Sequence, residues 1–207
     1  MFKYFRSENL WKIRCRKIWN DAFIGTGIFR GIGFAAMVSL WGFMLLVALL
    51  ATQRLWELRR SRRNEIRMRE RGGFERFPEH YRVLVALHVS WFVAMLAEVW
   101  YVRTAPPLWL VIAAFSGLAA GQTLRYLAIR TLAERWSTRI YVVPDAPLIK
   151  HGIYRFVRHP NYLGVILEIA SVPLLHAAYG TAVVFSLANL IILRHRIRLE
   201  ELALDEI

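Results

Sequence analysis

Five apolar stretches alternate with segments dense in arginine along most of the chain. They cover residues 33–51, 83–102, 108–124, 162–176 and 181–193. The first is uncharged and long enough to span a membrane as a helix, and the fourth is short and contains Pro173. The fifth is followed by Arg194, and we expect its helix to continue past that residue. The pattern predicts an all-α, integral-membrane bundle of about five transmembrane helices.

The polar segments between these stretches are predicted to be loops. Residues 54–82 contain ten Arg and five Glu, and residues 125–160 contain seven Lys or Arg. Within the second segment, residues 142–147 are typical of a turn or a short extended piece. In the third apolar stretch, Gly117 and Gly121 predict a close contact with another helix.

Composition supports a membrane protein. The 207 residues suit a single domain, and 57% of them are hydrophobic, with a mean hydropathy of +0.34. The net charge is +13, and its arginines bracket the apolar stretches, as the positive-inside rule describes. We therefore expect no nucleic-acid partner. The rule places residues 54–82, 125–160 and 194–207 on the cytoplasmic side of a multi-pass protein.

The N-terminal segment does not fit this topology. Residues 1–36 are basic and amphipathic, and five spans would place their charges outside. We treat residues 1–36 as one segment, which either lies on the membrane or precedes a natural start at Met37, and residues 37–207 as the main domain. The glycines at 25, 27, 31 and 33 resemble a nucleotide loop only superficially, because no strand precedes them.

The cysteine and histidine content argues against a metal site. Cys15 is the only cysteine, which excludes an internal disulfide and a cysteine-based metal site. The six histidines show neither HxxxH nor HExxH spacing. We expect no metal.

The residues that indicate chemistry lie at the two ends of the last apolar hairpin. The run from Gly152 to Gly164 includes Pro160, which suits the first turn of a helix. The free N–H groups of that turn favour an anionic group such as a carboxylate. Nearby residues add donors and flat apolar surfaces, namely Arg158, His159, Tyr154, Phe156 and Tyr162. The alternative interpretation is a turn that anchors the chain at the membrane interface.

The second run, residues 196–201, contains one cation and two carboxylates. Arg196 and Glu200 are spaced i,i+4 and share one helix face, with Glu201 beside it. Taken alone, these residues could be surface ion pairs that contribute little. Because the hairpin brings both runs to the same face, they suit a zwitterionic cofactor. A glutamate would bind its ammonium, and the helix start with Arg or His would bind its carboxylate.

The two runs together resemble the isoprenylcysteine carboxyl methyltransferase family. The resemblance rests on GxYxxxRHPxYxG, a long apolar stretch and RxxxEE, and it covers roughly residues 115–205. Leu124-Arg125 and the stretch 136–138 resemble the family's approach to the motif. Arg63-Asn64-Glu65 and the residues from Gly72 to Tyr81 resemble small bacterial members. Ile153 departs from the family, in which Pro is common at that place.

The resemblance implies an integral-membrane, S-adenosylmethionine-dependent O-methyltransferase. It implies a cytoplasmic C-terminal loop that binds the cofactor through Tyr154, Arg158, His159, Pro160, Tyr162, Gly164 and Glu200. It implies catalytic roles for Arg196, Glu200 and Glu201, and it leaves open which glutamate contacts the cofactor and which the acceptor. The acceptor would enter laterally from the lipid, and would be a prenylcysteine carboxylate or the hydroxyl of an alkylpyrone- or alkylresorcinol-like lipid.

Two other functions remain open at this point. Sterol-reductase-like membrane proteins have a similar C-terminal bundle and bind NADPH, although they are expected to be longer. A non-enzymatic membrane protein could bind anionic lipids through the arginines of residues 54–82. That function would not account for the cluster of Arg196, Glu200 and Glu201.

Overall fold

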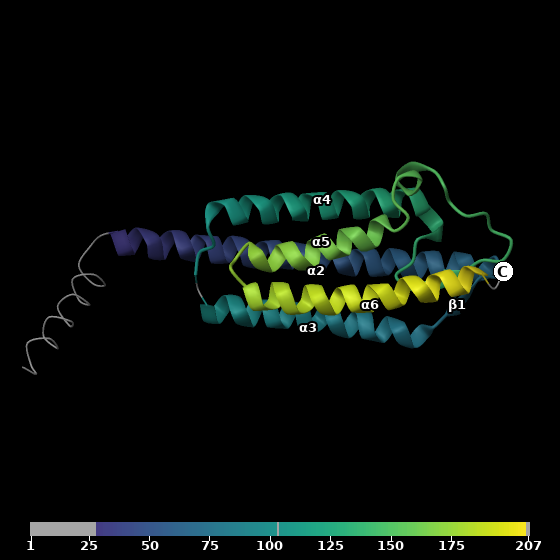
Figure 1. Cartoon of the computed structure of the whole chain (residues 1–207), viewed down its shortest axis with the longest axis horizontal. Helices are drawn as coiled ribbons and strands as arrows, with labels where there is room; N and C mark the ends of the chain where they lie inside the picture. The colour runs from purple at the N-terminus through teal and green to yellow at the C-terminus, as the bar shows by residue number, and fades with distance from the viewer. Residues whose placement is uncertain (1–27, 103, 206–207) are drawn as a thin grey trace, which may run out of the picture. The chain divides into compact units, whose positions relative to one another are not determined.

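The computed structural model describes residues 28–102 and 104–205, with side chains for residues 40–102 and 104–204. Residues 1–27, and with them most of the predicted N-terminal segment, lie outside this part. Residues 47–207 form one compact unit. The elements, labelled in Figure 1, are α2 (Ile28–Glu70), β1 (Phe74–Arg76), α3 (Pro78–Val102), α4 (Leu108–Leu132), η1 (Ala133–Arg135), β2 (Ile140–Val142), η2 (Gly152–Arg155), α5 (Pro160–Leu174) and α6 (Tyr179–Asp205).

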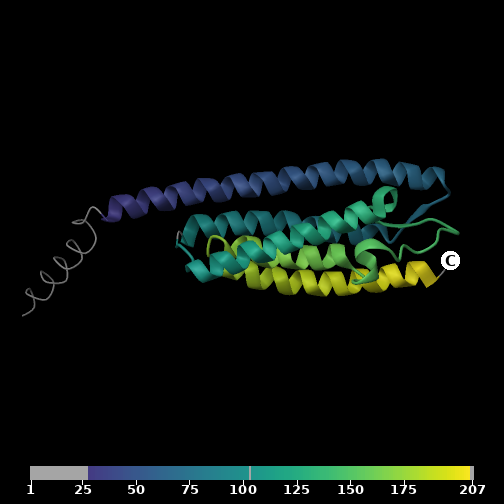
Figure 2. The ribbon, with the colours of Figure 1, turned by 90° about the horizontal axis from the view of Figure 1, so that it is seen from above.

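The predicted helical bundle is confirmed, with five long helices in the described residues and a two-stranded sheet as a minor addition. Helix α6 runs alongside both α3 and α5, and α5 lies against α4 (Figure 1, Figure 2). Two segments are long and apolar enough to cross a membrane, Pro78–Val102 and Leu108–Arg135, with mean hydropathies of 1.8 and 1.3. Both keep large apolar side chains exposed, such as Trp100 and Trp109. A lipid environment accounts for that exposure.

The arginine-rich segment 54–82 is not the loop that we predicted. Helix α2 continues through it to Glu70. The continuing helix buries Glu57, Ser61, Asn64 and Met68, which recur every three or four residues and therefore share one face. Most of the buried face is polar, so the hydrophobic pattern of the sequence does not reveal it.

The second predicted loop, residues 125–160, is also partly structured. Helix α4 extends to Leu132, and β2 forms where the segment approaches the predicted extended piece. Strand β2 pairs antiparallel with β1, with Phe74 opposite Val142 and Arg76 opposite Ile140. Ile140 and Val142 pack against Ala203 of α6. The sheet thus supports the end of α6, which continues beyond Arg194 as predicted.

Helices α4 and α5 approach each other closely at glycines. A Cβ atom added to Gly121 would lie 2.9 Å from the carbonyl oxygen of Gly164. One added to Gly164 would lie 2.5 Å from Cγ of Arg125 and 2.7 Å from the carbonyl oxygen of Gly121. Gly117 meets Ser171 in the same way. The close contact predicted from Gly117 and Gly121 is therefore confirmed.

The N-terminus of α6 is capped by a side chain of α3. Oε1 of Glu98 accepts a hydrogen bond from the backbone N–H of Gly180 at 2.8 Å. Its Oε2 accepts one from the N–H of Thr181 at 2.7 Å and one from Oγ1 of Thr181 at 2.6 Å. A carboxylate is the favoured partner for the unpaired N–H groups of a helix start. This contact fixes one end of the α3–α6 pair.

Candidate active site

The predicted cofactor turn forms the start of α5. His159 is the N-cap residue and Pro160 the first helical residue. No side chain of the described residues caps the helix, and its first backbone hydrogen bond runs from the N–H of Leu163 to the carbonyl oxygen of His159 at 3.1 Å. The N–H groups of the first turn are thus left for another partner. A helix start of this kind favours an anion.

The side chain of Tyr162, in the same turn, lies between Arg196 and Glu200 of α6. Its hydroxyl donates a hydrogen bond to Oε1 of Glu200 and accepts one from Nε of Arg196 at 2.8 Å. The Arg196 guanidinium also lies over the Tyr162 ring, with Cζ 5.7 Å from the centroid. The two predicted runs therefore meet.

Two aromatic residues complete this cluster. The His159 ring stacks on Tyr162, with centroids 5.5 Å apart and planes at 16°, and its Nδ1 lies 3.9 Å from Oε2 of Glu200. Tyr154 of η2 is half-buried, and burial, and after it the Glu200 carboxylate, raise the pKa of its phenol above the usual range. Tyr154 therefore stays neutral at physiological pH. The Glu200 carboxylate faces this group of aromatic residues.

Arg196 is held in place from the segment that precedes β2. Its Nη2 donates to the carbonyl oxygen of Thr138 at 2.9 Å, and its side chain is 4% exposed. The backbone N–H of Thr138 donates to Oγ of Ser61 on α2 at 2.9 Å. The sequence did not single out Ser61, because the interaction joins residues far apart in the chain. A fixed guanidinium can orient the cluster without the entropy cost of a mobile one.

The other predicted site residues are distributed differently. Arg158 and Glu201 are exposed, and no partner for either is found among the described residues. Pro160 is buried at the start of α5. Gly164 is buried against α4, where it permits the close helix contact described above. Of the two adjacent glutamates, only Glu200 joins the cluster.

Asn161, between Pro160 and Tyr162, has an unsatisfied group that the sequence did not single out. Its Oδ1 atom is buried and has no hydrogen-bond partner among the described residues. A buried acceptor without a partner is costly, so Oδ1 of Asn161 is available to accept a hydrogen bond. The free N–H groups of the turn, this acceptor and the Glu200 carboxylate fit the carboxylate and ammonium of an amino-acid-like cofactor.

A buried network of four charges lies among α2, α4 and α5. Arg54 pairs with Glu57 at 2.7 Å and with Glu168, while Arg125 pairs with Glu57 and lies 3.8 Å from Glu168. Glu57, Arg125 and Glu168 are 5% exposed or less. Buried charges persist only when paired. The ion pairs therefore join these three helices, and the hydrophobic pattern of the sequence does not reveal them.

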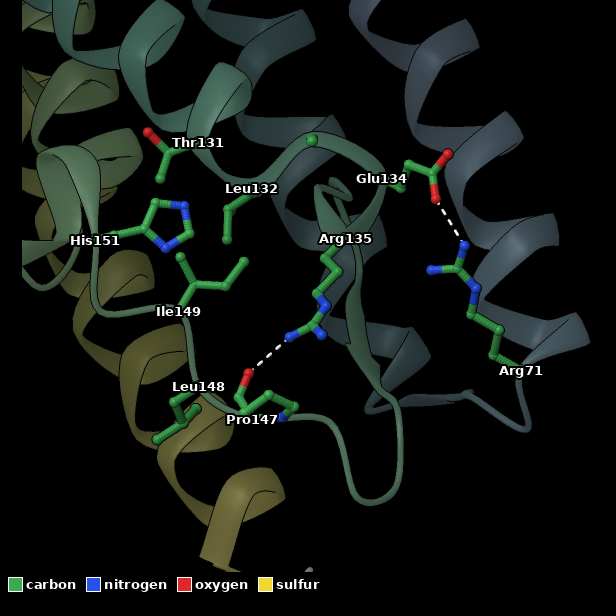
Figure 3. Close-up of a pocket in the computed structure, with 10 residues that line it drawn as sticks. Arg71, Thr131, Leu132, Glu134, Arg135, Pro147, Leu148, Ile149 and His151 are labelled. Atoms are coloured by element: carbon green, nitrogen blue, oxygen red, sulfur yellow. Dashed lines mark hydrogen bonds and ion pairs between the residues drawn. The ribbon is translucent and has the colours of Figure 1, made fainter.

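A separate hollow lies beside η1 and the segment 147–151 (Figure 3). Arg135 donates to the carbonyl oxygen of Pro147 at 2.6 Å, and Glu134 pairs with Arg71. None of the predicted site residues lines this hollow. No group of three potential metal ligands occurs among the described residues.

Comparison with known proteins identifies the family of the chain. Residues 110–206 match the profile of the isoprenylcysteine carboxyl methyltransferase (ICMT) family. The chain is 41% identical to protein YpbQ of Bacillus subtilis (strain 168) over 165 residues, which cover 79% of this chain and 97% of YpbQ. The chain belongs to the ICMT family. It is therefore assigned to a family of membrane methyltransferases.

A second bacterial relative is more distant. A protein of Haemophilus influenzae (strain ATCC 51907 / DSM 11121 / KW20 / Rd) is 27% identical over 159 residues, which cover 74% of this chain and 90% of that protein. Neither relative's name states an activity. No solved structure matches the chain. The matched region begins in α4 and includes both halves of the Tyr162–Arg196–Glu200 cluster.

Proposed function

We propose that this ICMT-family protein is an S-adenosylmethionine-dependent O-methyltransferase. One observation carries the proposal: the uncapped first turn of α5 also contains Tyr162, whose hydroxyl donates a hydrogen bond to the Glu200 carboxylate. The N–H groups and the carboxylate are complementary in charge to the carboxylate and ammonium of the cofactor's amino-acid moiety. S-adenosylmethionine, when bound, supplies an electrophilic methyl group.

The cofactor's carboxylate is assigned to the N–H groups of the first turn of α5, with His159 beside them. Its ammonium is assigned to Glu200, with Oδ1 of Asn161 as a second acceptor. Charge-assisted hydrogen bonds of this kind are about twice as strong as neutral ones. Tyr154 and Tyr162 provide flat apolar surface at the same place. These residues would hold the cofactor and keep water away from the reacting atoms.

Arg196 is assigned to position the reacting groups. It is buried and held by Thr138 and Tyr162, so its charge is fixed close to Glu200. A positive charge that is already in place lowers the barrier by orienting a carboxylate or phenolate oxygen for in-line attack. Glu201 has no assigned role, because its side chain is exposed and lies outside the cluster.

The acceptor is proposed to be a lipophilic molecule that enters from the membrane. Between the two acceptor classes implied by the family resemblance, we favour the hydroxyl of an alkylpyrone- or alkylresorcinol-like lipid over a prenylcysteine carboxylate. The chain resembles the small bacterial members of the family and has a bacterial relative over most of its length. A hydroxyl acceptor, unlike a carboxylate, requires a base.

A binding comparison tests the cofactor. Purified wild-type protein in detergent is titrated with S-adenosylmethionine and, separately, with NADPH. We expect saturable binding of S-adenosylmethionine and none of NADPH, followed by methyl transfer to pentadecylresorcinol detected by mass spectrometry. Binding of NADPH alone would favour a reductase. Binding of neither would leave a non-enzymatic lipid-binding protein.

The active site is proposed to face the cytoplasm in a multi-pass protein, because the positive charge of residues 54–82, 125–160 and 194–207 favours that side. The test introduces a cysteine for Asp145, which is exposed in the segment after β2, in a Cys15→Ser background. An impermeant maleimide should label it only after the cells are opened. Labelling in intact cells would show that this segment lies outside, and the proposed orientation would be wrong.

A further inference from the structure

A groove lies between α3 and α6 that the proposed cofactor site does not use. It has a volume of about 460 Å³, which is within the usual range for small-molecule sites. Its walls are apolar, with Val83 from α3 and Ile191, Ile192 and Leu199 from α6. Two histidines, His80 and His195, form its polar part, and Glu79 is the one carboxylate among the described residues that line it.

His80 is the most unusual residue of this groove. It is 8% exposed, and its Nε2 atom is buried without a hydrogen-bond partner among the described residues. Its ring meets that of His195 edge-on, with centroids 5.3 Å apart. A buried imidazole nitrogen without a partner is costly unless a ligand satisfies it. An apolar groove lined by such a side chain suits an amphiphile with one polar head.

The groove and the candidate active site are adjacent on α6. His195 precedes Arg196, and His80 lies close enough to the Arg196 guanidinium to interact with it electrostatically. The groups that face His80 are thus Arg196 and His195 from α6, with Glu79 next to it on α3. A molecule in the groove would place its polar head between His80 and Arg196, and Arg196 contacts Tyr162 and Glu200 of the candidate active site.

We infer that this groove holds the alkyl chain of the methyl acceptor, and that Nε2 of His80 accepts the proton of the acceptor's hydroxyl group. The inference rests on the proposed function. The acceptor oxygen forms a bond to the methyl carbon while the S–CH3 bond breaks and its electron pair stays on sulfur. The hydroxyl proton moves to neutral His80, which later returns it to water. The products are a methyl ether, S-adenosylhomocysteine and one proton.

The first test follows proton transfer without the cofactor. The probe is a nitrophenol that carries a pentadecyl chain, because its phenolate has a distinct absorption band. Bound to wild-type protein, it should ionise at a lower pH than in detergent alone, since imidazolium and Arg196 stabilise the phenolate. His80→Gln should bind the probe with a clearly smaller shift, because only the contribution of Arg196 remains. His88→Gln is the matched control on the same helix, because His88 bonds to the carbonyl oxygen of Leu84 instead of lining the groove.

The second test blocks the groove. Val83→Trp should weaken binding of the probe at least tenfold, whereas Val89→Trp should not, because Val89 is an exposed residue of α3 outside the groove. An excess of phosphatidylglycerol in the same micelles should leave binding unchanged. If the lipid displaces the probe, or if Val83→Trp binds it normally, the groove is not an acceptor site.

Kinetics complete the test. With pentadecylresorcinol as acceptor, His80→Gln should lower kcat roughly a hundredfold or more with little change in KM, as expected for loss of a general base. Wild-type kcat should rise with pH as His80 loses its proton, and His80→Gln should abolish that rise. Unchanged kcat and pH profile would overturn the inference. Failure of S-adenosylmethionine to bind wild-type protein would instead refute the proposed function, while the two probe tests would still decide on the groove.

Discussion

The hydroxyl of Tyr162 connects the two halves of the candidate active site, so its removal should affect both stability and cofactor binding. Tyr162→Phe keeps the ring that stacks on His159 but removes the acceptor of Arg196 Nε and the donor to Glu200. Leaving a buried donor unpaired costs about 1–3 kcal/mol. Glu200 Oε1 already lies 3.8 Å from Nε of Arg196, so a small movement allows a direct pair. We therefore expect the lower end of that range.

A loss of about 1 kcal/mol corresponds to a fall in melting temperature of roughly 2–4 °C for a chain of this size. The same movement draws Glu200 toward Arg196 and away from the cofactor's ammonium. We expect affinity for S-adenosylmethionine to fall about tenfold, which is roughly 1.4 kcal/mol. Thermal unfolding followed by tryptophan fluorescence and calorimetric titration measure the two effects.

Tyr126→Phe is the matched control, because Tyr126 is 62% exposed on α4 and should tolerate the change. If Tyr162→Phe has the melting temperature and the cofactor affinity of wild type, the hydroxyl does not join the two helices. If it lowers the melting temperature and leaves affinity unchanged, the cluster stabilises the hairpin only, and the argument that Glu200 binds the cofactor is wrong.

Three further predictions concern the surroundings of the site. Glu98→Gln removes the charge that caps α6 at Gly180 and should lower stability by about 1–2 kcal/mol in a thermal unfolding assay; unchanged stability would contradict the cap. Gly164→Ala would bring a Cβ atom within 2.5 Å of Arg125 and should cost about 1–3 kcal/mol; a normal melting temperature would refute the close contact. Folding raises the pKa of Tyr154. The neutral phenol therefore contributes fully to the stability of the folded protein below the pKa of the unfolded chain, about 10, and this contribution is lost as pH rises further. Tyr154→Phe should therefore lessen the loss of stability above about pH 10 in a pH series of melts, and an identical alkaline slope would contradict this.

The helical bundle and the meeting of the two polar runs could be predicted because both follow from local patterns. Apolar stretches of sufficient length indicate helices, and a short connection between the last two makes them antiparallel neighbours. The i,i+4 spacing of Arg196 and Glu200 placed them on one face, and the structure adds Tyr162 between them. The start of α5 could likewise be predicted, because proline favours the first turn of a helix.

The continuation of α2 past residue 54 could not be predicted, because most of the face that it buries there is polar, with Glu57, Ser61 and Asn64. A hydrophobic pattern records apolar burial, whereas these residues are buried by hydrogen bonds and ion pairs to distant segments. Asn64, for example, donates to the carbonyl oxygens of Ala133 and Trp136 at 2.9 and 2.8 Å. Partners so far apart in sequence leave no local signal.

The difference between Glu200 and Glu201 also required the structure. Adjacent residues on a helix point about a quarter-turn apart, so only one of them can face α5. Which one does so depends on how α6 is rotated against α3 and α5. Glu98 and the pairing of β1 with β2 contribute to that rotation, and neither contact is evident from the spacing of residues 196–201.

Cofactor binding by single alanine variants tests the central claim most directly. His159→Ala, Glu200→Ala and Glu201→Ala are titrated with S-adenosylmethionine by calorimetry in detergent, beside wild type and with thermal unfolding as the measure of folding. Hydrogen bonds to charged groups contribute about 1.5–3 kcal/mol, so His159→Ala and Glu200→Ala should each bind roughly ten- to a hundredfold more weakly. Glu201→Ala should bind like wild type. Folded His159→Ala and Glu200→Ala variants that bind the cofactor with wild-type affinity would contradict the assignment of this cluster as the cofactor site.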